Sequence, residues 1–467
     1  MKSVIVLVLL LLGVSAIGPI SAQTASPGFT NQVYLSSGGD SENPQIIASN
    51  DGIFTLWEQQ SSGKSDVFFK KSADGGNTFG TAINLSESTV GQSGYSDFVQ
   101  QGNDVYAIWQ SSISGYAEVY LAKSTDGGSS FEKPMILSNQ SKLAAFPQVA
   151  MSENHVYATW LEKSDNNATN VVFVKSDDKA KSFGNPSYIT SHAGNSGIPK
   201  LLAGGNNVYV LWEDNRKGNF EIFLSKSDDN GVSFSSTDIS NTAGQSGAPQ
   251  IIVSKDHMYV VWMDDSSGNY DIMFSKSTDG GKSFSQPVNV SKLHTDSGYP
   301  QLAVYGNNVY VTWTQTIVEP NYDVYLAKSS NNGDTYDTPI NLSHNNGASG
   351  WPNVLSDGNV YVSWVDSSHG KFDVLITKSV DGGNIFENAT NVSSSAAESY
   401  ESQMAALNNQ VFMVWQEGPK GNHAISFSKS TTFVPEFGPF ALIAFLISII
   451  AIIGISAKSN LRLKAGF

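Results

Sequence analysis

The sequence predicts an all-β protein: an eight-bladed β-propeller with four short strands in each blade, over residues 31–431. Three observations predict this fold: a tryptophan recurring about every 50 residues, four strand-like runs in each interval, and one isolated strand-like run before the first repeat. Such a period indicates supersecondary units that need their neighbours to bury an apolar face. The recurring residues are Trp57, Trp109, Trp160, Trp212, Trp262, Trp313, Trp364 and Trp415.

The sixth repeat shows the strand pattern. Its runs are rich in Val, Ile, Tyr and Thr and are separated by Gly, Asn, Asp and Ser clusters, at residues 299–303, 308–313, 323–329 and 339–343. This composition is typical of strands joined by turns. Because successive side chains point to opposite faces of a strand, we expect Trp313 to pack on one neighbouring blade and Tyr310 on the other.

The two ends of the repeat region predict how the ring closes. The eighth repeat stops at Ser430, after its third strand, and residues 33–36 resemble an isolated fourth strand. We expect residues 31–37 to complete the last blade and leave no open edge. An open solenoid built from the same repeat is the alternative.

A turn of the form S-x-D-x-G-x-[ST]-[FY] recurs between the third and fourth strands, as in residues 72–79. It resembles the Asp-box of sialidase-like and BNR-repeat propellers. We expect its acidic residue to accept hydrogen bonds from its own loop and its glycine to adopt a positive φ. A calcium loop is disfavoured, because alternating ligands and a distal Glu are missing. The residues at the acidic position are Asp74, Asp126, Asp178, Asp229, Asp279, Asn331 and Asp381.

Both termini carry apolar segments. Residues 1–22, with Lys2 ahead of an apolar core, predict a secretory signal peptide. Residues 440–457 predict a transmembrane helix about 27 Å long, close to the roughly 30 Å of a bilayer core. The basic tail 458–467 predicts a cytoplasmic end and an extracellular propeller.

The linker 432–439 contains Pro435-Glu436-Phe437-Gly438. With the apolar helix and basic tail it resembles the PEFG-type sorting signal of archaeal surface proteins, which implies cleavage by an archaeosortase. A retained single-pass anchor and a cleaved one both stay open. In either case we expect the protein at the outer face of the cell, anchored to the membrane or surface.

Composition narrows the function classes. The absence of cysteine excludes a disulfide scaffold and a cysteine zinc site. A net charge of −15, from 27 basic and 42 acidic residues, argues against nucleic acid as a partner. No metal site and no cofactor are predicted.

Seven sequons fit an extracellular location. The glycosylation candidates are Asn84, Asn139, Asn167, Asn289, Asn341, Asn388 and Asn391. Four of them share one repeat position, so a structural turn role would produce the same pattern: Asn84, Asn289, Asn341 and Asn391.

One residue at the start of each innermost strand is expected at the mouth of the ring, and five of the eight are aromatic: Tyr95, Phe146, Tyr299, Trp351 and Tyr400. Aromatic rings stack on sugars, and concave mouths are common ligand sites. Packing on the residues beneath them is the alternative.

Arg216 is the one arginine of the predicted propeller. It is a candidate to bind an anionic ligand or to form a surface salt bridge.

Most repeats also carry two carboxylates in one connection, such as Asp264 and Asp271. One such pair can hydrolyse a glycoside, but recurrence around the ring favours a structural role as hydrogen-bond acceptors. The sialidase resemblance implies three arginines, a tyrosine nucleophile and six blades. This chain has only Arg216 and Arg462, and Gly197 stands where the motif F/Y-R-I-P places arginine.

We therefore expect a non-enzymatic surface propeller that binds glycans or cell-surface or matrix proteins. The alternatives are an exo-sialidase-like or other glycoside hydrolase, and a structural coat component.

Overall fold

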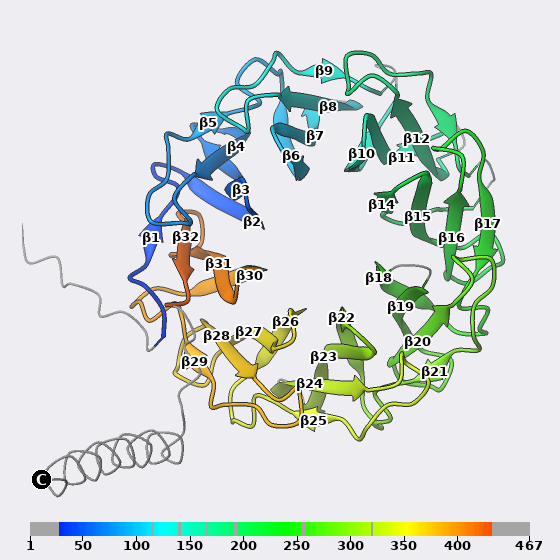
Figure 1. Cartoon of the computed structure of the whole chain (residues 1–467), viewed down its shortest axis with the longest axis vertical. Coiled ribbons are helices and arrows are strands. Elements are labelled where there is room, and N and C mark those ends of the chain that lie inside the picture. Colours follow the sequence, from blue (N-terminus) through cyan, green and yellow to red (C-terminus); the bar gives the residue numbers. More distant parts are fainter. Residues whose placement is uncertain are drawn as a thin grey trace, which may run out of the picture.

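The computed structural model describes residues 28–431, except residues 114–115, 139–141, 165–166, 191–193, 255–256 and 319–320. Eight four-stranded antiparallel sheets stand around a central opening (Figure 1). The predicted eight-bladed propeller is therefore confirmed. The predicted signal peptide, linker, transmembrane helix and basic tail lie outside the described residues. Within those residues, no helix has the length and apolar character needed to cross a membrane.

Each blade runs from an innermost strand at the opening to a short outermost strand. In blades 1 to 4 the strands are β2 (Asp40–Ser49), β3 (Gly52–Ser61), β4 (Lys64–Ser72) and β5 (Ile83–Asn84); β6 (Gln92–Gln101), β7 (Asp104–Ile113), β8 (Tyr116–Ser124) and β9 (Met135–Ile136); β10 (Ala144–Ser152), β11 (His155–Lys163), β12 (Thr169–Ser176) and β13 (Ser187–Tyr188); β14 (Lys200–Gly204), β15 (Asn207–Asp214), β16 (Glu221–Ser227) and β17 (Ser235–Asp238).

Blades 5 to 8 repeat this order, and the last takes its outermost strand from the start of the chain. The strands are β18 (Ser246–Ser254), β19 (His257–Asp264), β20 (Asp271–Ser277) and β21 (Val288–Asn289); β22 (Ser297–Tyr305), β23 (Asn308–Val318), β24 (Asn321–Ser329) and β25 (Ile340–Asn341); β26 (Ser349–Ser356), β27 (Val360–Asp366), β28 (Asp373–Ser379) and β29 (Thr390–Asn391); β30 (Ser399–Leu407), β31 (Gln410–Glu417), β32 (Ala424–Lys429) and β1 (Val33–Tyr34).

The N-terminal segment closes the ring as predicted. Strand β1 pairs antiparallel with β32, with Val33 opposite Phe427. The backbone N–H of Leu35 donates to the carbonyl of Ile425 at 2.7 Å, and Phe29 forms a bridge to Ser430. The structure is thus a closed ring and not an open solenoid.

The core consists of apolar layers between adjacent blades. All eight recurring tryptophans are buried. Trp313 of blade 6 packs with Val261 of blade 5, and Tyr310 packs with Val362 of blade 7. Alternate side chains of this strand therefore pack in the two interfaces on either side of blade 6, as predicted.

The recurring aspartate turns have the predicted hydrogen bonds. Asp74 accepts from the backbone N–H groups of Asn77 and Thr78 at 3.0 and 2.9 Å, and Gly76 has a φ of 79°. The acidic-position residue accepts from the amide four residues later in all seven turns, Asn331 included. In the third turn Ala180 takes the glycine position with a φ of 57°.

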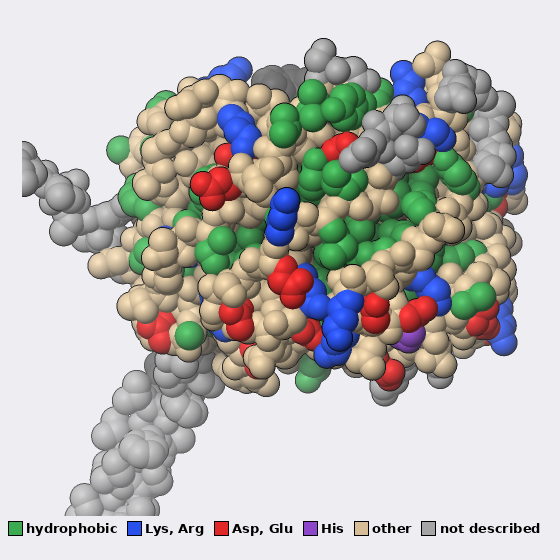
Figure 2. All heavy atoms as spheres, turned by 90° about the horizontal axis from the view of Figure 1, so that it is seen from above, with side chains coloured by type: hydrophobic (Ala, Val, Ile, Leu, Met, Phe, Trp, Pro, Cys, Tyr) green, Lys and Arg blue, Asp and Glu red, His purple; other side chains and the backbone are tan. Residues whose placement is uncertain are grey.

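On the side of the ring shown in Figure 2, acidic and basic side chains are interspersed.

Candidate functional site

A β-bulge in the innermost strand sets the direction of the residues predicted at the mouth. The pairing of β22 with β23 shifts register between Gly298 and Gln301, and Tyr299 lies in that bulge with a φ of 52°. Trp351 lies in the same bulge of blade 7 with a φ of 50°. Bulges re-aim a side chain away from the regular sheet face. Tyr299 and Trp351 are accordingly 56% and 53% exposed.

The eighth blade corrects one predicted position. Its register shift falls between Tyr400 and Gln403, and the bulge residue with positive φ is Glu401. Tyr400 therefore stands one residue ahead of the position held by Tyr299 and Trp351, and Glu401 takes that position.

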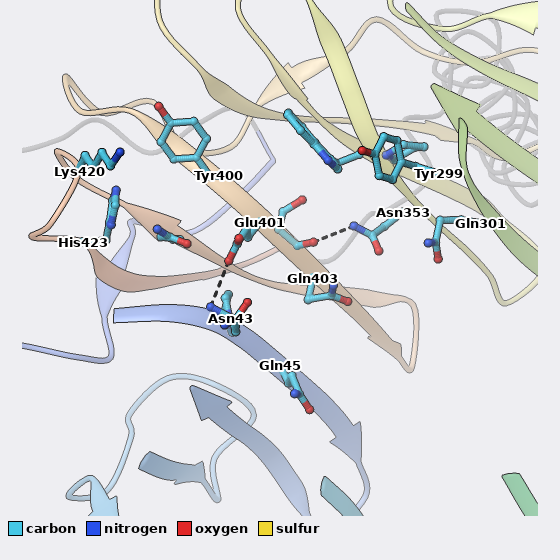
Figure 3. A pocket seen from close by; sticks show the side chains of 15 residues that line it. Asn43, Gln45, Tyr299, Gln301, Asn353, Tyr400, Glu401, Gln403, Lys420 and His423 are labelled. Atoms are coloured by element: carbon cyan, nitrogen blue, oxygen red, sulfur yellow. Dashed lines mark hydrogen bonds between the residues drawn. The ribbon is translucent and has the colours of Figure 1, made fainter. Parts of the chain in front are cut away.

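A hollow of about 680 Å³ opens between the bulges of blades 6, 7, 8 and 1. Tyr299 and Trp351 lie side by side on its wall, with ring centroids 6.3 Å apart. Tyr400, Lys420 and His423 line the opposite side (Figure 3). The sequence-predicted aromatic residues Tyr299, Trp351 and Tyr400 are thus brought together in one site.

Amide side chains form much of the remaining wall: Asn43, Gln45, Gln301, Asn353, Gln403 and Gln416. An amide both donates and accepts hydrogen bonds. The side chains of Gln301 and Gln403 have no hydrogen-bond partner among the residues that the structure describes. They face the hollow with their full hydrogen-bonding capacity (Figure 3).

Two buried polar atoms of this wall also lack a partner. Gln416 is 6% exposed, and its Oε1 atom has no hydrogen-bond donor within the described chain. The hydroxyl of Ser402, which is 3% exposed, has none either. Buried polar groups in native proteins are nearly always hydrogen-bonded, so these two atoms show that the hydrogen bonding of this wall is incomplete.

The charged groups gather at the seam between blades 8 and 1. The backbone N–H of Asn43 donates to Glu401 at 3.1 Å, and its side-chain amide donates to Glu58 at 3.2 Å. Burial raises the pKa of Glu58. Burial and the negative charges of Asp40 and Glu401 raise the pKa of Glu42, which the charge of His423 opposes. This corner of the hollow therefore carries a surplus of negative charge.

Other predicted site residues lie outside the hollow. Tyr95 and Phe146 pack edge to face at 4.6 Å on blades 2 and 3. Arg216 binds the buried carboxylate of Asp214 through two nitrogens, at 2.9 and 2.7 Å, and stacks over Phe223. Burial alone would raise the pKa of Asp214, but the bonds from Arg216 and Trp212 lower it to about 2. The intramolecular salt bridge is thus the alternative that the structure favours for Arg216.

The carboxylate pair Asp264 and Asp271 accepts hydrogen bonds within its own blade. Asp264 and Asp271 face each other across β19 and β20, and both are buried. Asp264 accepts from the backbone N–H of Ser266 at 3.0 Å and the hydroxyl of Ser246 at 2.8 Å, and Asp271 accepts from the hydroxyl of Ser291 at 3.2 Å. The donors include hydroxyls as well as the predicted backbone groups.

The shared sequon position also has a structural role. Asn84 donates to Asp66 at 3.1 Å and Asn341 donates to Asp323 at 2.8 Å. Asn289 and Asn391 accept backbone N–H bonds in the same turn. Among the other candidates, Asn167 and Asn388 are exposed and Asn139 lies outside the described residues. Glycosylation stays a prediction at these positions.

Reasoning from the sequence missed the amides and the His423 corner. One signal for the amides was present: proline followed by an amide recurs at residues 44–45, 147–148, 249–250, 300–301 and 352–353. No local pattern marks His423, because its neighbour Asp40 is 383 residues away.

The fold and the hollow define the class: a closed β-propeller with a ligand-sized site at its mouth. No protein-family model matches the chain, and the search of curated proteins found no match. Among solved structures, a protein of unknown function from Dyadobacter fermentans DSM 18053 is 13% identical, with 86% of this chain and 99% of that chain covered and a TM-score of 0.42.

Two further matches are the Hadza microbial sialidase Hz136 and a PL25 ulvan lyase. The sialidase is 11% identical, with coverages of 67% and 71% and a TM-score of 0.40. The lyase is 10% identical, with coverages of 71% and 90% and a TM-score of 0.48. All three TM-scores lie below 0.5, so these matches carry no argument about a ligand of this chain.

Proposed function

We propose that this protein is a carbohydrate-binding propeller that holds a glycan in the hollow between blades 6, 7, 8 and 1. The observation that carries the proposal is an exposed aromatic pair, Tyr299 and Trp351, in a hollow whose wall includes the unpaired amides of Gln301 and Gln403. Sugar rings present apolar C–H faces that stack on aromatic rings, and hydroxyls that need both donors and acceptors.

The orphaned atoms support a hydroxyl-bearing ligand. Both atoms are shielded from solvent, so a sugar hydroxyl bonds Gln416 Oε1 or the Ser402 hydroxyl only after a small rearrangement of the wall, which removes the cost of a buried unpaired group. A purely apolar ligand would leave these atoms unpaired. The predicted signal peptide and C-terminal apolar segment support display of the hollow outside the cell, where glycans are present.

Binding of the purified full-length chain to a panel of neutral, acidic and amino oligosaccharides tests the proposal. We expect Trp351→Ala and Tyr299→Ala each to weaken binding about tenfold, since truncation removes roughly 50 Å² of apolar contact at about 25 cal/mol per Å². The matched control is Tyr95→Ala. Tyr95 occupies the equivalent bulge position of blade 2, is 54% exposed and lies outside the hollow.

Gln416→Leu separates binding from folding. Replacing an unpaired buried amide by an apolar side chain of similar size leaves the unfolding midpoint unchanged or raises it, while the ligand loses a hydrogen-bond partner. Equal binding by wild type and Gln416→Leu, or equal loss in Tyr95→Ala and Trp351→Ala, would contradict the site. Release of shorter saccharides during the same incubation would instead identify a glycoside hydrolase or lyase.

A further inference from the structure

Three metal-ligating side chains from opposite ends of the chain meet where the ring closes. Asp40 and Glu42 lie at the start of β2, and His423 lies just before β32. One ligand atom of each lies within 4.8 Å of the others. A transition metal bonds nitrogen and oxygen at about 2.0–2.2 Å, which places two ligand atoms of one tetrahedral ion roughly 3.3 Å apart. The contact between Asp40 and His423 therefore opens slightly, and the exposed Glu42 side chain moves in, when the three surround one ion.

Two of the three groups are already in contact. His423 is 6% exposed, and its Nδ1 atom lies 2.6 Å from Oδ1 of Asp40. The same oxygen accepts the backbone N–H of His423 at 2.9 Å, and the imidazole packs edge to face on Tyr400. The other ring nitrogen, Nε2, has no hydrogen-bond partner among the described residues, although the side chain is nearly buried.

No lysine or arginine of the described residues forms an ion pair with the carboxylates of this corner. Among the ion pairs of the described residues, Asp40 is paired only with His423, and neither Glu42 nor Glu401 is paired with a lysine or arginine. By contrast, Asp66 has Lys64 and Asp214 has Arg216. A bound cation would neutralise the surplus.

We propose that Asp40, Glu42 and His423 bind one divalent transition-metal ion of the zinc class at the seam between blades 8 and 1. Imidazole nitrogen suits zinc and its neighbours, whereas calcium and magnesium take oxygen ligands. The ion joins the first innermost strand to the last blade and so stabilises the closed ring by its binding free energy. This site differs from the expectation of no metal drawn from the sequence.

Calorimetric titration of the chelator-treated full-length chain with ZnCl₂ tests the proposal. We expect one ion per chain, a higher unfolding midpoint with Zn²⁺, and no comparable response to CaCl₂. His423→Ala and Glu42→Gln each weaken Zn²⁺ binding at least tenfold. Glu42 is exposed, so Glu42→Gln keeps the metal-free unfolding midpoint of the wild type even where His423→Ala does not.

The matched control is His155→Ala. His155 forms a similar pair with Asp177, with Nδ1 and Oδ1 2.8 Å apart, but no further carboxylate completes that group within the described residues. Its Zn²⁺ affinity stays at the wild-type value. Absence of Zn²⁺ binding, a preference for Ca²⁺, or unchanged affinity in Glu42→Gln would overturn the site. No saccharide is present, so failure here leaves the proposed glycan site unaffected.

Discussion

Asp97 and Lys200 occupy, in blades 2 and 4, the innermost-strand position that carries an amide in the other six blades. Asp97 accepts the backbone N–H of Val149 of blade 3 at 2.9 Å. Burial raises the pKa of Asp97 to about 6, although this hydrogen bond and the charge of Lys200 oppose the shift. Burial in turn lowers the pKa of Lys200. These two residues therefore make the opening chemically unequal around the ring.

The raised pKa of Asp97 predicts a loss of stability as pH increases. The folded pKa lies above the unfolded value near 3.9, so the folded state binds this proton more tightly, and stability falls between about pH 4 and pH 6. We expect Asp97→Asn to match the wild type near pH 3.5 and to be on the order of 2 kcal/mol more stable at pH 7. Denaturant unfolding across that range measures the difference.

The control for this prediction has the opposite sign. Hydrogen bonds from Ser130 and Ser124 lower the pKa of Asp126 to about 2. Its contribution to stability is present above about pH 4 and is lost toward pH 2, so Asp126→Asn destabilises at pH 7 and less at low pH. A pH-independent difference between Asp97→Asn and wild type would contradict the assignment.

At the scale of the element, the closing segment joins the two ends of the chain. Only two residues of β1 pair with β32, but the adjacent Leu35 is buried among Trp57, Phe412 and Phe427. This cluster combines blades 1 and 8. The apolar side chain, together with the short ladder, therefore holds the ring shut.

Leu35→Ala should open this seam. Truncating a buried leucine costs about 2–5 kcal/mol, so we expect a clearly lower unfolding midpoint and greater exposure to proteolysis. Val33→Ala in the same segment is the control, because Val33 is 40% exposed and contributes mainly through its backbone. Thermal unfolding with limited proteolysis compares the two, and equal effects would show that side-chain burial does not hold the seam.

At the scale of the whole molecule, eight similar blades produce an unsymmetrical mouth. The hollow lies against blades 6, 7, 8 and 1, where Tyr299, Trp351 and Tyr400 gather. On the other side, Tyr95 and Phe146 pack against each other, and Ala248 has no aromatic side chain. The eight blades therefore repeat as a scaffold, while the hollow lies on one side of the ring.

This asymmetry predicts one glycan per ring. A saccharide identified on the panel should bind with a stoichiometry near one, and Trp351→Ala should reduce affinity without changing that number. Isothermal titration measures both. Several equivalent sites per chain would mean that the repeated rim, and not the hollow, binds the ligand.

The sequence by itself determined the number of blades, the closing strand and the hydrogen-bonding role of the aspartate turns. These features are local or periodic. Trp313 and Tyr310 alternate along one strand, and Asp74 bonds to its own loop. The residues that determine each feature therefore lie within a single repeat. The same local reasoning placed Tyr299 and Trp351 at the mouth of the ring.

Only the tertiary structure decided which of these residues share a site. Strand register placed Glu401 rather than Tyr400 in the bulge of blade 8, and ring closure brought Asp40 to His423. The bulge position and the contact between Asp40 and His423 both depend on how strands pair, and the periodicity of the sequence does not predict either one. Burial decided which polar atoms lack a partner. Gln416 Oε1 is an acceptor without a donor because the packed blades exclude water from it.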